Sequence, residues 1–164
     1  MFRPALLLFA CTSLAAAAPV SLVFDTDLGT DCDDVTALAM IHALRKRGAV
    51  DLLAVTVTKD HPRAAALVDA INTFYGAPDI PVGVVRDGAT PEEGRYLKMV
   101  DLKTSEGRPA YPHDLRSGEA APEAVDLLRE VLASRPDQSV TLCQVGFFTN
   151  FSRLLDSKPD RHSK

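Results

Sequence analysis

The sequence has few basic residues, few cysteines and no long apolar run beyond its N-terminus, and each shortage excludes a class of protein. Its 164 residues carry a formal net charge of -4, so no excess of positive charge is present for binding nucleic acid. No stretch after the N-terminus is long and apolar enough to span a membrane. The three cysteines have no framework spacing. What remains is a chain of single-domain length, and its hydrophobic content of 46% is enough for a proper core.

The N-terminus has the pattern of an export signal. Arg3 supplies a positive charge, residues 5–14 are apolar, and the alanines at 15–18 are the small residues that a signal peptidase prefers. We therefore expect residues 1–18 to be a signal peptide and the chain to be exported, to the periplasm or outside the cell. Export permits a disulfide between Cys32 and Cys143, but two cysteines without framework spacing favour free thiols.

After this segment, predicted strands and helices alternate. Apolar, β-branched runs predict strands at 20–24, 51–58, 80–85 and 139–145, and helical patterns lie between them and after the last one. This alternation predicts an α/β fold over residues 20–158, an open parallel sheet with helices on both faces, like one half of a Rossmann fold. No internal repeat is evident.

Residues 86–119 interrupt the alternation, because they lose periodicity and fill with glycine, proline and charge. A connection of that length in a compact domain usually has a function, such as covering a site. Tyr96, His113 and Asp114 are its candidates for reaching a ligand, although an ordinary surface position is the simpler interpretation of each.

The most informative stretch runs from Ser21 to Leu38, where a predicted strand is followed by five aspartates within ten positions and then by a helical pattern. No lysine or arginine lies between Pro4 and Leu44, so the aspartates have no basic neighbour in sequence. Carboxylates so close together disfavour each other's ionised form, and a hard divalent cation such as Ca²⁺ or Mg²⁺ relieves that repulsion. The simpler alternative is a solvated loop in which Asp33 and Asp34 meet the helix dipole.

Several polar segments are expected at one edge of the sheet. The acidic loop, Lys59 to His61, the segment after Val85 and residues 146–150 each follow a predicted strand. Ligands of open parallel sheets bind at the carboxyl ends of the strands. We therefore expect these four segments to converge on one site.

Two known chemistries fit the acidic loop poorly. An EF-hand counted from Asp25 would need Gly at the sixth position and Glu at the twelfth, where Thr30 and Thr36 stand. A Mg²⁺-dependent phosphatase of the haloacid dehalogenase type also places Asp-x-Asp after its first strand. Leu28 intervenes where those enzymes continue with Gly-Thr, and Asp33-Asp34 would be unexplained, so this stays a minor alternative.

The chain resembles the nucleoside hydrolase family of the inosine-uridine preferring type. Its signature, Asp-x-Asp-x-Gly-x-Asp-Asp after the first strand, is matched by residues 25–29 and 33–38 on either side of a two-residue expansion. Residues 145–150 resemble the family's Gly-x-x-Thr-Asn segment. The resemblance covers residues 20–158.

The resemblance implies hydrolysis of the bond between ribose and base in a ribonucleoside, with bound Ca²⁺. By this comparison Asp27 would ligate the ion and act as the catalytic general base, Asp34 would be a bidentate ligand, and Thr149 would offer its backbone carbonyl. Asp33 would hold the ribose hydroxyls, and Asp25 would support Asp27, the general base. These roles are chemically consistent, because a bound ion lowers the pKa of its water and a carboxylate takes the proton.

The sequence departs from the family in the sugar-binding part. The expansion around Asp31 leaves open whether Asp31 or Asp33 takes the ribose role. The family usually offers an Asn after the second strand, and Lys59-Asp60-His61 stands there instead, which suggests an altered sugar or substrate class. Asp60, His61 and Asn150 are therefore further candidates for substrate binding.

A third departure is length. Family members are roughly twice as long, and their remaining Asp ligand and a His near the leaving group lie in the second half. His162 is not at a matching position. The alternative to an enzyme is therefore a catalytically incomplete fragment that binds metal or sugar, and a homo-oligomer is a further possibility.

Overall fold

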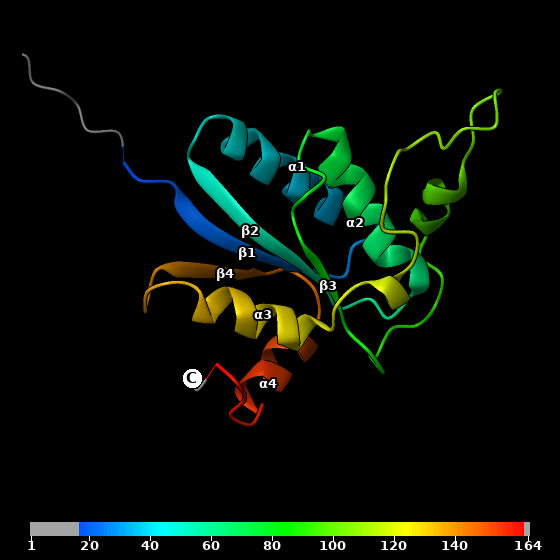
Figure 1. Ribbon diagram of the computed structural model, residues 1–164. Coiled ribbons are helices and arrows are strands. Elements are labelled where there is room, and N and C mark those ends of the chain that lie inside the picture. Colours follow the sequence, from blue (N-terminus) through cyan, green and yellow to red (C-terminus); the bar gives the residue numbers. More distant parts are fainter. Residues whose placement is uncertain (1–16, 163–164) are drawn as a thin grey trace, which may run out of the picture.

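The computed structural model describes residues 17–162, so the expected signal peptide lies almost entirely outside the described residues. Four parallel strands form one sheet in the order β3-β2-β1-β4 (Figure 1). The strands are β1 (Val20–Thr26), β2 (Val50–Val57), β3 (Val82–Val84) and β4 (Val140–Gln144). The helices are α1 (Asp33–Lys46), α2 (Pro62–Phe74), α3 (Ala124–Ala133) and α4 (Thr149–Leu155), with short 3₁₀ helices η1 (Leu97–Asp101) and η2 (Gly118–Ala120). This confirms the expected fold class.

The sheet is covered on both faces, with α1 and α2 on one side and α3 and α4 on the other (Figure 1). Successive strand residues point to opposite faces, so β1 contributes to two apolar clusters. Leu22 and Phe24 pack in the larger cluster with α1 and α2, whereas Val23 packs with Leu128 and Phe151 from α3 and α4. This double burial explains why β1 and β2 are almost continuously apolar.

Most element positions match the sequence pattern, with two informative differences. The third strand was expected over 80–85 but spans only Val82–Val84, because Pro81 has no N–H for a ladder hydrogen bond. In α2, the apolar pattern includes Leu67, Val68 and Phe74; the first two are buried, but Phe74 is 78% exposed. Phe74 is the last residue of α2 and belongs to neither apolar cluster.

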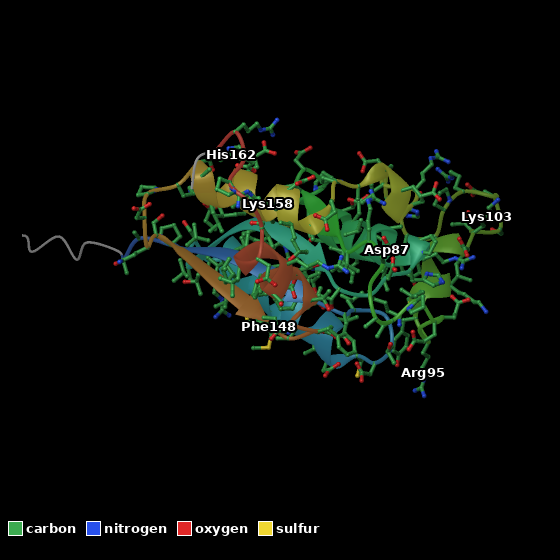
Figure 2. All side chains as sticks on the ribbon, turned by 90° about the horizontal axis from the view of Figure 1, so that it is seen from below. Asp87, Arg95, Lys103, Phe148, Lys158 and His162 are labelled. Atoms are coloured by element: carbon green, nitrogen blue, oxygen red, sulfur yellow. The ribbon has the colours of Figure 1, made fainter. Side chains whose placement is uncertain are left out.

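The segment between β3 and α3 is anchored to the acidic loop. Leu97 of η1 is completely buried in the larger core cluster, and the Tyr96 N–H donates to the Gly29 carbonyl at 2.9 Å. Lys103 lies at its outer tip, far from the sheet (Figure 2). The segment therefore covers the loop after β1, which is the function expected from its length.

The strand order places a topological switch point between β1 and β4. From β1 the chain moves outward through β2 to β3, and then returns to the other side of β1 to form β4. In open parallel sheets such a switch point leaves a crevice at the carboxyl ends of the strands. Within residues 17–162 no helix is long and apolar enough to cross a membrane.

Candidate active site at the switch point

The carboxyl ends of β1, β2 and β4 are held tightly together. The Val145 N–H donates to the Asp25 carbonyl at 2.9 Å, and the Phe147 N–H donates to the Thr58 hydroxyl at 3.2 Å. A Cβ on Gly146 would lie only 2.5 Å from the backbone nitrogen of Asp27. Glycine is needed here because any side chain would push the end of β4 away from the acidic loop.

Asp25 lies near the carboxyl end of β1, at this switch point, and is completely buried. Its Oδ2 accepts a hydrogen bond from Thr56 Oγ1 at 2.6 Å and another from Asn150 Nδ2 at 2.8 Å, while Oδ1 has no partner within residues 17–162. Burial raises the pKa of Asp25 to about 6, and the charge of Asp27 adds to the rise, although the two hydrogen bonds oppose it. Asp25 thus joins the ends of β1, β2 and β4 to the start of α4.

The loop after β1 brings three carboxylates together. One oxygen each of Asp31, Asp33 and Asp34 lies within 4.8 Å of the others. Asp34 is only 7% exposed, and burial raises its pKa to about 6, helped by the charges of Asp27 and Asp33. A hydrogen bond with the Thr26 side chain acts in the opposite direction. A carboxyl group in this position holds a proton more readily than an ordinary aspartate.

Asp31 and Asp33 interact with each other at the exposed side of the cluster. A hydrogen bond between the two side chains raises the pKa of Asp31 and lowers that of Asp33. Asp33 Oδ1 also accepts from the Asp34 N–H at 3.0 Å. Both side chains are exposed and remain open to a ligand.

The donor set fits a hard divalent cation. Asp31, Asp33 and Asp34 offer only oxygen, and within residues 17–162 none of them forms an ion pair with Lys or Arg. Such a set suits Ca²⁺ or Mg²⁺. The simpler alternative also fits in part, because Asp33 and Asp34 stand in the first turn of α1, where they meet the helix dipole, although the N-cap residue Cys32 makes no side-chain capping bond.

The expected metal ligands lie around this cluster but are not all part of it. Asp27 is half-buried and its charge raises the pKa of Asp34, so the two carboxylates are electrostatic neighbours. The cluster itself unites Asp34 with Asp31 and Asp33, because these three share the turn that starts α1. Thr149 is the first residue of α4, beside the buried Asn150.

The other expected substrate-binding residues form hydrogen bonds with protein groups outside the acidic cluster. Asn150 is completely buried and donates to Asp25, so it positions that carboxylate instead of facing the crevice. Asp60 Oδ2 accepts from the Gly88 N–H at 2.8 Å, and His61 is the N-cap of α2, accepting from the Arg63 N–H at 3.2 Å. The backbone after Asp60 and His61 leaves the same sheet edge, but neither side chain joins the acidic cluster.

Of the three candidates in the segment between β3 and α3, only Tyr96 contacts the acidic loop. Tyr96 contacts the acidic loop through its backbone, as described above. His113 Nδ1 pairs with the Tyr111 carbonyl at 2.7 Å, and the Asp114 N–H donates to Asp69 of α2 at 3.0 Å. His113 and Asp114 are therefore ordinary loop residues held against α2.

Sequence reasoning missed two threonines, Thr56 in β2 and Thr58 directly after it. Thr56 donates to Asp25, and Thr58 links the ends of β1 and β4. Their spacing of two was the available signal, because alternate residues of an extended chain point to the same side. Cys32 and Cys143 are both free thiols, as the spacing favoured.

Comparison with known proteins agrees with this geometry. The sequence model of the inosine-uridine preferring nucleoside hydrolases matches residues 22–164. The chain belongs to this family. No curated protein sequence gives a significant match. Members of the family are in general metal-dependent enzymes acting on small-molecule nucleosides.

Two solved structures share the fold of this nucleoside hydrolase family member. One is a plant nucleoside hydrolase, the PpNRh1 enzyme, with a TM-score of 0.56 and 22% identity, covering 86% of this chain and 44% of that one. The other is the type III effector protein XopQ complexed with adenosine diphosphate ribose, with a TM-score of 0.62 and 20% identity, covering 86% of this chain and 39% of that one. The chain thus spans less than half the length of either relative.

Proposed function

We propose that this chain carries the N-terminal part of a Ca²⁺-dependent site that hydrolyses the N-glycosidic bond of ribonucleosides to ribose and free base. The observation that supports it best is the gathering of carboxylates at the carboxyl end of β1. Asp31, Asp33 and Asp34 form a cluster, and the charge of Asp27 raises the pKa of both the buried Asp25 and Asp34. Family membership supports the reaction class. The ribosyl ligand of XopQ supports a sugar in the crevice.

Each carboxylate has a distinct task in this proposal. When bound, Ca²⁺ lowers the pKa of a ligated water molecule. Asp27 accepts the proton of the attacking water, and its half-buried position keeps it accessible. Asp34 binds the ion together with the Thr149 carbonyl, and Asp33 or Asp31, both exposed, holds the ribose hydroxyls.

Asp25 and the surrounding charges act less directly. Asp25 does not contact substrate, because it is completely buried, and its task is to hold the ends of β1, β2 and α4 in register. The dense negative charge also stabilises the positive charge that develops on a sugar as the glycosidic bond breaks.

A second candidate is a catalytically incomplete domain that binds the ion or the sugar without turnover. The specific observation in its favour is that the chain covers only 44% and 39% of the two solved relatives. On this alternative the acidic cluster binds Ca²⁺, but no group assists departure of the base.

One pair of measurements separates these candidates. Calcium is titrated into the chain by calorimetry, and ribose release from inosine and uridine is then assayed with the ion present. Binding with turnover supports the hydrolase, and binding without turnover supports the incomplete domain. Asp27→Asn should abolish release, whereas Asp79→Asn, at an exposed turn before β3, should not. Absence of Ca²⁺ binding overturns the Ca²⁺-dependent hydrolase and the ion-binding form of the second candidate, and Mg²⁺-dependent phosphate release from a phosphomonoester would favour the phosphatase alternative.

We also propose that the chain is exported. Support comes from the basic, apolar and small-residue pattern of residues 1–18. Expression of the whole chain with a C-terminal tag, followed by fractionation and mass measurement, should find it outside the cytoplasm and shortened by about 18 residues. A full-length cytoplasmic product would contradict export.

A further inference from the structure

A second cavity lies at the same sheet edge, between the ends of β2 and β3. Its volume is about 190 Å³, and it is lined by residues 59–62 before and at the start of α2, by Val84 to Arg86 after β3, and by Gly118 and Glu119 of η2. None of the acidic-cluster residues lines it. This cavity, here called the β2–β3 pocket, is therefore separate from the acidic cluster.

Lys59 is the unusual residue of the β2–β3 pocket. It is only 4% exposed, yet within residues 17–162 its ammonium group has no hydrogen bond and no ion pair to a carboxylate. The ammonium nitrogen is not one of the fully buried atoms without a partner, so the stem of Lys59 is covered while its charged end still reaches solvent. Since Lys59 also lines the cavity, an anion placed there would supply the missing partner.

Most of the other polar side chains of the pocket already form hydrogen bonds with other protein groups. Asp60 accepts from the Gly88 N–H, and Arg86 Nη2 donates to the Ala121 carbonyl at 2.9 Å. His61 Nδ1 accepts from the Arg63 N–H, so a neutral His61 carries its proton on Nε2 and can donate from there. Glu119 is the one exposed carboxylate of the lining, and it opposes anion binding.

The position of the pocket relates it to the proposed catalytic crevice. Lys59 directly follows Thr58, whose hydroxyl contacts the ends of β1 and β4. Neighbouring strands lie about 5 Å apart, so the end of β2 is one strand spacing from the end of β1. The pocket therefore lies at the strand end next to the one that carries the acidic cluster.

We propose that the β2–β3 pocket binds a phosphate group through Lys59, and that the substrates of this chain are ribosyl compounds bearing a phosphate, such as nucleoside monophosphates. The substrate class rests on the proposed function, whereas phosphate binding by the pocket does not. Lys59 is the principal binding group, and His61 Nε2 supplies a second donor. The sequence Lys59-Asp60-His61, which differs from the family pattern, is thus assigned to recognition of the charged substituent.

The first test uses inorganic phosphate without calcium, in buffer with a chelator, so that no metal at the acidic cluster can bind the anion. Phosphate should raise the Tm of the wild-type chain in a concentration-dependent way, since a ligand of the folded state stabilises it. Lys59→Met should weaken phosphate binding at least tenfold, and Glu119→Gln should strengthen it. Lys98→Met is the matched control, because Lys98 is a lysine with a 70% exposed side chain outside the pocket, and it should leave binding unchanged.

Equal phosphate affinity in wild type and Lys59→Met, or no stabilisation of the wild type at all, would overturn the pocket assignment. Should Lys59→Met fail to fold, amide shifts of the wild-type chain during the phosphate titration give the answer instead. Shifts at Lys59, His61 and Arg86 support the proposal. Shifts confined to other segments refute it.

The second test compares ribose 5-phosphate with ribose and with inorganic phosphate. Ribose 5-phosphate should bind more tightly than either, and the preference over ribose should disappear in Lys59→Met. No gain over inorganic phosphate would reject a ribosyl substrate while leaving the phosphate pocket intact. If phosphate binds at Lys59 but neither inosine nor inosine 5′-monophosphate releases base, the proposed function fails and the pocket stands.

Discussion

Asp25 and Asn150 lie 125 positions apart in sequence, yet Asn150 Nδ2 donates a 2.8 Å hydrogen bond to Asp25 Oδ2 inside the protein. Both side chains are completely buried. The bond joins the end of β1 to the start of α4, and so fixes the acidic loop relative to the far side of the switch point. Residues from the two family-like motifs thus form one structural unit.

Loss of this bond should destabilise the fold. Asn150→Ala would leave a buried carboxylate oxygen with one donor instead of two, and such losses amount to about 1.5–3 kcal/mol. Urea denaturation should show this decrease in the free energy of unfolding. Ser152→Ala, on the exposed side of the same helix, is the control and should change stability by less than about 0.5 kcal/mol. Equal effects of the two substitutions would contradict the structural role of Asn150.

Removal of Asp34 should weaken calcium binding. Asp34 is the buried member of the acidic cluster, so its position is the best defined of the three. Asp34→Ala should reduce Ca²⁺ affinity by calorimetry far more than Asp79→Ala, which removes an exposed carboxylate outside the cluster.

The same ion should stabilise the folded chain. At 100 times the dissociation constant, Ca²⁺ adds about 2.7 kcal/mol, which a chelator removes. A Tm that is insensitive to both calcium and chelator, or equal Ca²⁺ affinity in the two variants, would remove the metal assignment.

A methyl group at Gly146 should separate β4 from the acidic loop. The added Cβ would meet the Asp27 nitrogen at 2.5 Å, the Thr58 hydroxyl at 2.6 Å and the Thr26 carbonyl carbon at 2.7 Å. Two of these atoms are backbone, so Gly146→Ala should lower stability by about 1–3 kcal/mol or prevent folding. Gly118→Ala is the matched control, because its nearest neighbour is 3.6 Å away. Comparable unfolding midpoints for both variants would show that the close approach is not required.

Stability should depend on pH through His42. This side chain is buried between Asn72, at 2.9 Å, and the stacked ring of Tyr75. Burial lowers the pKa of His42 below 6.5, and the charges of Arg45 and Lys46 lower it further, although the bond to Asn72 opposes the shift. The unfolded chain then binds a proton near pH 6.5 when the folded chain does not, so stability falls as the pH decreases through that value.

The measurement is the difference between wild type and His42→Leu. Urea unfolding from pH 7.5 to 5.5 should give the wild type the steeper loss of stability on acidification, because only the wild type has this imidazole to protonate. Asp25 and Asp34, whose pKa values are raised, act in the opposite direction but equally in both proteins. Parallel curves would refute the assignment.

Much of the fold was readable from the sequence, because local patterns encode local structure. Apolar runs without polar alternation predicted the buried strands, and the helical periods between them predicted a parallel sheet covered on both faces. The turn from β1 to α1 also followed from sequence, since five aspartates without a basic neighbour identify a loop suited to a cation. The family motifs pointed to the same loop.

The tertiary structure decided the contacts between distant residues. The strand order, with β4 beside β1, brought Asn150 into hydrogen-bond contact with Asp25, and Thr56 and Thr58 became visible as supports only once their partners were known. Phe74 lies in a helical apolar pattern but is exposed, and Lys59 is a charged residue but is buried. Whether a side chain is covered depends on which elements pack over it. Sequence periodicity assigns a residue to a face, and only the packed chain determines what covers that face.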